Sequence, residues 1–410
     1  MRYAEFIALM ALVMSTVAMS TDAVLPALSL IGQELGAGEN QRQLVIGALF
    51  LGLASSQVFF GPLSDRFGRK PVILFGFAVF AIGCLISIGA SNFEAMLVGR
   101  FVQGLGAAGP RVISTAMIRD RFEGREMAKI MSTIMTLFIL VPVFAPAIGQ
   151  GILTFTHWRG IFWFFIAMGV GTSVWMAVRM AETLRPENRH PLTISRVGGA
   201  FREIFTHPVT MGYLLAMSCV FSAFVGYLST AQQIFQELYG LGAKFPLAFG
   251  CMAGTLGLAS FINSRLVVRL GMRVLIRRAL ATNVLLAGTF TLVAYTLGGV
   301  PPLWLVFAFM MPVFFCHGTV FGNIQAMAMQ PMGHIAGSAA AVIGAVATTI
   351  STTVGSMIGQ AFNGTVLPLA LSFTVLPLLA LLFSGWANRH LDANAAGGHK
   401  AEEANSDEEN

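Results

Sequence analysis

Asp22 is a carboxylate deep within a long apolar stretch of this 410-residue chain. It lies in Ser-Thr-Asp-Ala-Val-Leu-Pro-Ala-Leu, where Pro26 predicts a kink in a helix. An acid inside a membrane is a functional hypothesis by default, because its desolvation must be offset. Burial raises a carboxyl pKa and a nearby cation lowers it, so an acid held between the two can load and release a proton. The alternative is a structural acid locked in a salt bridge with an arginine of another helix.

Arg100 is the candidate partner of Asp22. It stands in another apolar stretch, and Gln103, three residues on, shares its helical face. Counted from the outer boundary at 1.5 Å per residue, Asp22 and Arg100 lie about 13 and 9 Å deep, so they are plausible partners in depth. The string Arg-Phe-Val-Gln-Gly-Leu-Gly-Ala-Ala around Arg100 resembles a motif of a known transporter family whose Arg is linked to proton coupling, and this resemblance makes Asp22 and Arg100 the candidate coupling pair. Arg111 either lines the cavity further in or reaches toward the membrane surface, and both interpretations stay open. His317 is a further candidate proton carrier, although a lone histidine in a helix is more often a packed residue.

The elements that position these residues are membrane-spanning helices. The chain is 56% hydrophobic and 11% charged, whereas soluble proteins carry about 25% charged residues. Its mean hydropathy is +0.74. A spanning helix needs about 20 apolar residues, and on that measure the sequence predicts about twelve spans, at residues 4–31, 43–62, 72–91, 94–117, 128–151, 158–180, 209–235, 245–265, 274–297, 302–325, 337–360 and 364–386.

The basic residues predict the orientation of these spans. With both ends on the cytoplasmic side, 20 Lys and Arg fall on that side, three fall on the other, and Arg100 and Arg111 lie within a span. Such an excess follows the positive-inside rule and predicts two cytoplasmic termini. Because the basic residues occur in short clusters between apolar runs, the net charge of +6 does not indicate a nucleic-acid groove.

A charged loop separates the second and third predicted spans. Residues 61–71 read Gly-Pro-Leu-Ser-Asp-Arg-Phe-Gly-Arg-Lys-Pro, and the four ionisable side chains of this string must lie at the membrane surface. The pattern Arg-Phe-Gly-Arg-Lys recurs faintly as residues 269–273, 203 residues later, where Val268 takes the place of Asp65. A displacement of about half the chain indicates two related halves.

These features resemble the major facilitator superfamily of transporters, whose signature loop between helices 2 and 3 is similar to residues 61–71. The resemblance implies an all-α integral membrane fold with about 12 transmembrane helices in two six-helix bundles, and substrate bound between the halves. The implied division is an N-terminal bundle, a cytoplasmic linker, a C-terminal bundle and a disordered acidic cytoplasmic tail, at residues 1–180, 181–207, 208–386 and 387–410.

The same resemblance implies a latch at the inner gate. In it Arg69 pairs with Asp120, and Asp65 caps a helix of the opposite half. The latch residues are Gly61, Asp65, Arg66, Gly68, Arg69 and Asp120. The alternative is that these charges only fix the topology, and the added acid and two glycines favour the latch.

Further motifs narrow the resemblance. The span-5 string Val-Pro-Val-Phe-Ala-Pro-Ala-Ile-Gly-Gln-Gly is similar to the proline-glycine motif of exporters, with Ala145 and Gln150 as departures. Together with Thr21-Asp-Ala-Val-Leu-Pro, Tyr227-Leu-Ser-Thr-Ala-Gln-Gln and Gly322-Asn-Ile-Gln-Ala, it resembles the bicyclomycin/chloramphenicol-resistance (Bcr/CflA) group of drug:proton antiporters, over residues 15–385.

We therefore expect a proton-coupled secondary transporter that exports amphipathic small molecules, in multidrug or metabolite efflux, by alternating access. A proton-coupled uptake symporter for a specific nutrient stays open, as does a non-transporting membrane sensor. A specific polar solute would need several placed hydrogen-bonding groups, and the spans carry few. The candidate substrate-binding residues are Gln103, Phe138, Phe144, Phe224, Tyr227, Gln232 and Asn323.

Other function classes find little support. An intramembrane enzyme would need paired acids, a histidine cluster or a nucleophile with its base, and a single deep acid with scattered histidines does not supply one. The four cysteines are far apart and predict neither a disulfide framework nor a metal site. We expect no cofactor beyond the proton gradient. The expected partners are the lipid bilayer, protons and amphipathic substrates, with no nucleic acid, for a monomer in the cytoplasmic (inner) membrane of a bacterium.

Overall fold

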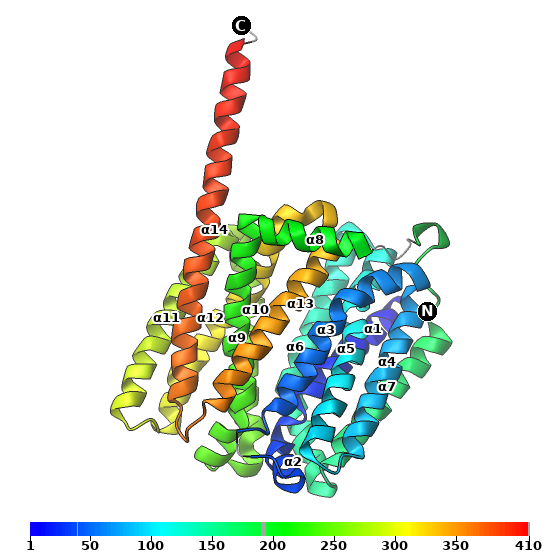
Figure 1. Ribbon diagram of the computed structural model, residues 1–410, viewed down its shortest axis with the longest axis vertical. Coiled ribbons are helices and arrows are strands. Elements are labelled where there is room, and N and C mark those ends of the chain that lie inside the picture. Colours follow the sequence, from blue (N-terminus) through cyan, green and yellow to red (C-terminus); the bar gives the residue numbers. More distant parts are fainter. Residues whose placement is uncertain (39, 190–193, 409–410) are drawn as a thin grey trace.

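The computed structural model describes residues 1–38, 40–189 and 194–408. Within them, the side chains of residues 393–408 and of positions 124, 125, 128, 132, 135, 136, 139, 188 and 194–197 are not described. The described chain is helical and forms two bundles that stand side by side (Figure 1).

The first bundle contains six spanning units. Its first helix is interrupted: α1 (Tyr3–Asp22) ends at the acid, a short turn η1 (Leu25–Ala27) follows, and α2 (Leu28–Leu35) completes the span. The kink expected at Pro26 is therefore a break that places Asp22 at a helix C-terminus. The other helices are α3 (Leu44–Phe67), α4 (Arg69–Ile88), α5 (Phe93–Arg121), α6 (Gly124–Phe155) and α7 (Arg159–Arg179).

The second bundle follows a linker that contains η2 (Pro186–Asn188) and α8 (Ile194–Thr206). Its first helix, α9 (Pro208–Gln232), continues as a π-helix, η3 (Gln233–Leu238), and the 3-10 turn η4 (Gly242–Lys244) follows. The remaining elements are α10 (Phe245–Leu270), α11 (Met272–Thr296), α12 (Leu303–Met329), the 3-10 turn η5 (Gln330–Ile335), α13 (Ala336–Gln360) and α14 (Leu367–Glu408).

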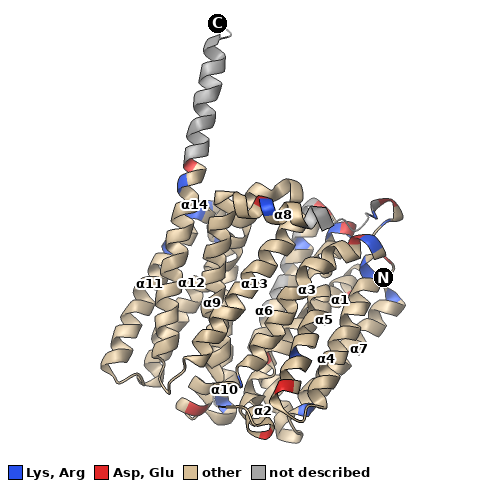
Figure 2. Ribbon diagram, viewed as in Figure 1, with Lys and Arg blue, Asp and Glu red and all other residues tan. Residues whose placement is uncertain are grey.

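Hydropathy and helix bounds together give twelve spans in the described chain. Nine helical stretches are long and apolar enough to cross a membrane, and one of them, Leu303–Gln360, contains both α12 and α13. α5 falls outside that set, since polar residues such as Arg100, Gln103 and Arg111 lie within it. α6 contributes a shorter apolar stretch, Leu140–Phe155. The Lys, Arg, Asp and Glu residues lie mainly toward the two ends of the bundles (Figure 2).

The internal repeat is visible in the backbone. Gly68 joins α3 to α4 with φ +100°, and Gly271 joins α10 to α11 with φ +77°. Each lies in the left-handed region, which glycine enters without a Cβ clash. The two halves therefore turn at equivalent points in the same way.

The segment expected to be the linker is partly ordered. Residues 198–206 belong to α8, which lies across one end of the bundles (Figure 1) and packs against α13. The last span extends past residue 386, because α14 is described with its side chains through Asp392, which pairs with Arg273 at 2.8 Å. The rest of the predicted acidic tail lies outside the residues whose side chains are described, and its disorder stays a prediction.

We call the end of the bundles that carries α2, η3 and the turn after α13 the distal end, and the opposite end, where α8 lies, the linker end. The halves contact each other mainly along two helix pairs, α3 with α13 and α6 with α10. These two helix pairs lie on either side of the region between the bundles. Several candidate site residues lie on other helices, namely α1, α5, α9 and α12.

Candidate functional site between the two halves

Asp22 ends α1, and its side chain is buried, with the residue 6% exposed. The described residues supply no salt bridge to it. The Tyr227 phenol of α9, in the other half, lies within electrostatic range of Asp22. The Tyr227 hydroxyl is itself buried without a hydrogen-bond partner among the described residues. An acid and a phenol from opposite halves therefore face the same interior region.

Arg100 is completely buried and reaches the broken helix through its backbone. Its Nη1 donates to the carbonyl of Ser20 at 3.0 Å and to Gln103 Oε1 at 2.7 Å, and its Nε donates to the carbonyl of Val45 at 3.1 Å. Carbonyls in the last turn of a helix lack intrahelical partners, so the break at Asp22 creates the acceptor that Arg100 uses. Asp22 and Arg100 are thus linked through α1 and make no ion pair with each other in the described structure.

The break in α1 is packed directly against the proline-glycine motif of α6. Gly149 lies against Ala23, so close that a Cβ at position 149 would overlap the Ala23 carbonyl oxygen. Only glycine permits this approach. Pro142 and Pro146 lie inside α6. The motif therefore supports the helix break that holds Asp22.

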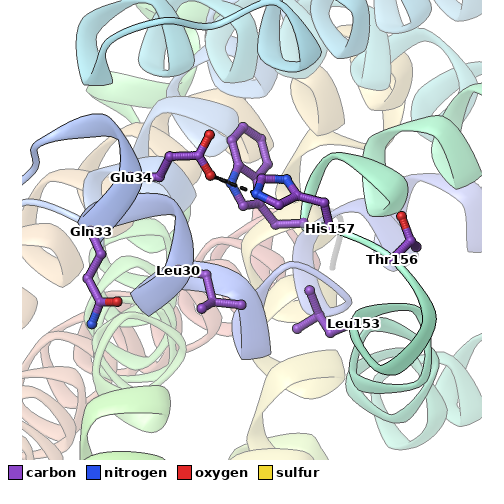
Figure 3. Close-up of a pocket in the computed structure, with 7 residues that line it drawn as sticks. Leu30, Gln33, Glu34, Leu153, Thr156 and His157 are labelled. Carbon is purple, nitrogen blue, oxygen red and sulfur yellow. Dashed lines mark hydrogen bonds and ion pairs between the residues drawn. The ribbon is translucent and has the colours of Figure 1, made fainter.

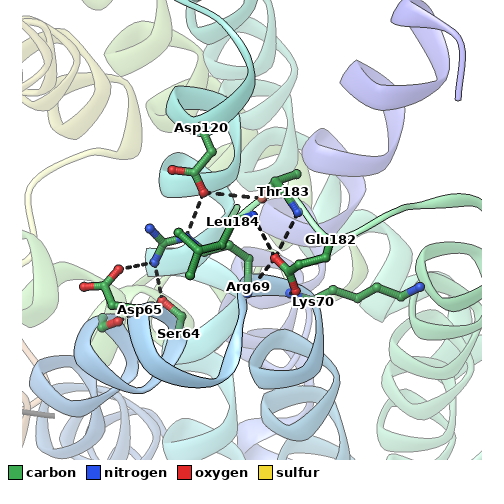
Figure 4. Close-up of polar contacts among 9 residues, drawn as sticks. Ser64, Asp65, Arg69, Lys70, Asp120, Glu182, Thr183 and Leu184 are labelled. Atoms are coloured by element: carbon green, nitrogen blue, oxygen red, sulfur yellow. Dashed lines mark hydrogen bonds and ion pairs between the residues drawn. The ribbon is translucent and has the colours of Figure 1, made fainter. Parts of the chain in front are cut away.

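The charged loop between α3 and α4 forms a compact network within the first half (Figure 4). Arg69 donates to Asp65 Oδ1 at 2.5 Å, to Asp120 Oδ2 at 2.9 Å and to Ser64 Oγ at 2.7 Å. The Arg69 side chain is 5% exposed, against 15% for Asp120 and 43% for Asp65. Asp65 has its described partner within its own half, and the helix of the opposite half that it was expected to cap is not among its contacts.

Glu182, in the linker, completes this network and was not predicted. Its carboxylate accepts from the N–H groups of Arg69 at 2.9 Å and Lys70 at 3.1 Å, and so caps the N-terminus of α4 (Figure 4). A Cβ on Gly68 would lie 2.6 Å from Glu182 Oε2. Gly68 thus provides both the turn and the space for the cap. Of the other latch candidates, Arg66 is exposed over the Phe67 ring, and Gly61 has open space beside it.

The candidate substrate-binding residues do not form one cluster. Phe224 and Tyr227 belong to an aromatic cluster with Phe314 and Phe321 of α12, where the Tyr227 and Phe314 ring centroids are 4.6 Å apart. Phe138 is half-buried against the core and Phe144 is 56% exposed on α6. The polar candidates, Gln103, Gln232 and Asn323, form hydrogen bonds with other side chains of the protein.

The partners of these polar candidates are specific. Gln103 binds Arg100, Gln232 donates to Glu237 at 3.0 Å, and Asn323 donates to Asn263 at 2.8 Å. His317 is buried inside the second half, where its Nδ1 lies 2.9 Å from Asn283 Nδ2. That contact keeps His317 within the packing of α11 and α12.

Polar contacts between the halves are concentrated at the distal end. Arg42, which precedes α3, donates to Glu237 Oε2 in η3 at 2.6 Å, and Ser29 of α2 donates to Glu237 Oε1 at 2.6 Å. Gln43 binds Gln233, and Asn40 donates to the carbonyls of residues 360 and 362 at 3.0 and 2.9 Å. We call these contacts the distal latch. The hydrogen bonds between the halves that the described residues show belong to this distal latch, so the halves are tied at that end.

A separate pocket opens at the distal end of the first half (Figure 3). It has a volume of about 460 Å³ and lies between α2 and the α6–α7 loop. Glu34 at its edge accepts from Arg159 at 2.5 Å, from His157 at 2.8 Å and from Trp158 at 2.7 Å. With its carboxylate fully bonded, Glu34 ties α2 to that loop. The pocket does not include the residues around Asp22.

Comparison with known proteins identifies the family. Residues 10–359 match the model of the Major Facilitator Superfamily. The chain belongs to this superfamily. It is 30% identical to a bicyclomycin resistance protein homolog of Haemophilus influenzae over 88% of this chain and 90% of that protein. This similarity places it in the Bcr/CflA group of the superfamily.

Two further comparisons agree. A multidrug resistance protein MdtL of Klebsiella pneumoniae is 30% identical over 57% of this chain and 59% of that protein. The crystal structure of a D-xylose-proton symporter shares the fold, with a TM-score of 0.74 over 94% of this chain and 97% of that chain, at 13% identity. The predicted fold, a superfamily bundle of about twelve helices in two halves, and the predicted family are both confirmed. The roles of the single residues stay predictions.

Proposed function

We propose that this superfamily transporter is a proton-driven exporter of amphipathic small molecules that works by alternating access. The observation that carries the proposal is Asp22, a buried acid without a described salt bridge, at the break of a spanning helix and within electrostatic range of Tyr227 of the second half. An unpaired acid at this depth can bind a proton in one state and release it in another. The names of the relatives, which refer to resistance to bicyclomycin and to multiple drugs, support export as the direction.

The proposal extends to location and partners. The charge excess of the loops supports two cytoplasmic termini, so the linker end faces the cytoplasm and the distal end faces outward. The structure is then closed toward the outside by the distal latch. We propose a monomer in the inner membrane of a bacterium, with the proton gradient as its energy source. Its partners are the bilayer, protons and its substrates, without a cofactor or nucleic acid.

The chemistry of the interior favours amphipathic substrates over a specific polar nutrient. Recognition of a polar solute requires convergent hydrogen-bonding groups, and Gln103, Gln232 and Asn323 each bond within the protein. Tyr227 packs against Phe314 in a buried aromatic cluster, and its hydroxyl has no hydrogen-bond partner among the described residues. Aromatic rings of this kind pack against varied apolar groups. Uptake of a nutrient is the weaker proposal.

The decisive experiment is transport by purified protein in liposomes with an imposed pH gradient, across a panel of drugs and metabolites. We expect the gradient to drive accumulation of amphipathic compounds, and Asp22→Asn to abolish it. The control is Asp392→Asn, which removes an exposed acid at the linker end. Flux that persists in Asp22→Asn with unchanged pH dependence would move the coupling role to another residue.

A further inference from the structure

Arg111 lies far inside the membrane region on α5. Ten residues separate it from Arg121, the last residue of that helix, which corresponds to about 15 Å at 1.5 Å per residue. Its neighbour toward the distal end, Arg100, is completely buried and bonded through its Nε and Nη1. Arg111 differs because its side chain is exposed and, in the described structure, has no hydrogen bond or ion pair.

The exposed face that begins at Arg111 is polar. The exposed positions in this part of α5 include Arg111, Thr115 and Arg119, spaced four residues apart and therefore on one face of the helix. Lipid-facing helices of the same half expose apolar side chains, as α7 does with Trp163, Val170 and similar residues. A stripe of two arginines and a threonine is unsuited to lipid.

The depth of Arg111 indicates that its side chain faces the interior. It is exposed, although it lies about 15 Å from the end of α5. A charged side chain at such a depth faces the bundle interior or a water-filled cavity and not lipid. Because the described hydrogen bonds between the halves lie at the distal end, the stripe from Arg111 to Arg119 faces a part of the interior that opens toward the linker end.

An unpaired guanidinium at this depth is expensive unless an anion reaches it. Asp120, the acid next to Arg119, is engaged by Arg69. The planar fork of arginine matches the oxygens of a carboxylate, sulfonate or phosphate in two parallel hydrogen bonds. No described residue pairs with the Arg111 guanidinium, so a ligand can complete this position.

We propose that Arg111 is the site that receives an acidic group of the exported molecule, so that the preferred substrates are amphipathic anions. The aromatic cluster around Tyr227 takes the apolar part, and Arg111 selects the charged part from the cytoplasmic side. This inference rests on the proposed export function. It adds a substrate class, which the unpaired acid at Asp22 by itself does not define.

The test uses two probes with one skeleton: dansyl-phenylalanine, which carries a carboxylate, and its neutral methyl ester. Equilibrium binding to the purified protein is followed by dansyl fluorescence. We expect the wild-type protein to bind the acid at least tenfold more tightly than the ester. Arg111→Gln should weaken binding of the acid by about tenfold and change binding of the ester less than twofold. Arg111→Lys should retain part of the preference, because it keeps the charge and loses the fork.

The matched control is Arg119→Gln, which removes an exposed arginine at the end of the same stripe and should leave the preference intact. Equal or absent binding of the two probes by the wild-type protein overturns the inference. A preference that survives Arg111→Gln, or a loss of both probes together, overturns it as well. Flux in liposomes is measured separately: a preference for the acid without any gradient-driven flux would reject the export function and leave the anion site standing.

Discussion

The distal latch makes a quantitative prediction about the balance between conformations. Arg42 Nη2 and Glu237 Oε2 are 2.6 Å apart, with the two side chains 11% and 38% exposed. Exposed ion pairs contribute about 0–1 kcal/mol, and hydrogen bonds to charged groups about 1.5–3 kcal/mol. Because Glu237 is partly open to solvent, we place this pair between those limits, at about 1–2 kcal/mol. Since 1.4 kcal/mol is a factor of ten, the pair should bias the equilibrium toward distal closure about 5- to 30-fold.

A double-mutant cycle measures this bias. The variants are Arg42→Gln, Glu237→Gln and the double change, in a background without the four native cysteines. Spin labels at Phe155 and Tyr295, which are 92% and 74% exposed on opposite halves, report the populations of the distal-closed and distal-open states. Each single change should raise the open population, and the double change should add little, because the pair is lost in either single variant.

Two controls separate the ion pair from general damage at the distal end. The exchange of charges, Arg42→Glu with Glu237→Arg, should restore closure. Arg159→Gln removes an ion pair that lies at the same end but within one half, and it should leave the distance distribution unchanged. If the two single changes act independently, or if neither alters the distribution, the latch does not couple the halves and the reasoning is refuted.

Three further predictions concern other parts of the protein. Asp22→Asn should abolish flux driven by a pH gradient while fluorescence still detects binding of neutral ligands, since the amide resembles the protonated acid. Gly149→Val should destabilise the folded protein by about 1–3 kcal/mol, because its side chain collides with the helix break at Ala23; a lower melting temperature in detergent than for Gly151→Val, where a Cβ meets open space, would show it. Arg69→Ala should impair cycling with normal membrane insertion, measured as slower flux at equal expression, and normal flux would remove it from the gate.

Hydropathy predicted the spans because apolar length is a local property. The predicted bounds differ from the observed ones where charged residues continue a helix past the membrane surface. The third span was predicted to begin at residue 72, whereas α4 begins at Arg69, since Gly68 supplies the turn and Glu182 caps the first N–H groups. A charge in sequence marks the edge of the membrane and does not mark the end of a helix.

The site was predictable only in part, for a geometric reason. A count of residues gave similar depths for Asp22 and Arg100, but depth does not define the direction in which a side chain points around its helix. The structure turns the Arg100 fork toward the Ser20 carbonyl and Gln103. Glu237 and Arg42 are 195 residues apart, and no local pattern relates them.

The interrupted first helix connects these separate observations. The turn that ends α1 at Asp22 leaves the Ser20 carbonyl for Arg100, and Ala23 packs against Gly149 of α6. Seven residues beyond Asp22, Ser29 donates to Glu237 in the distal latch. A change in charge at Asp22 therefore acts on a short, firmly held segment whose other end takes part in closing the two halves. This covalent path gives a physical route by which proton binding inside the first half can influence closure at the distal end, without an ion pair between Asp22 and Arg100.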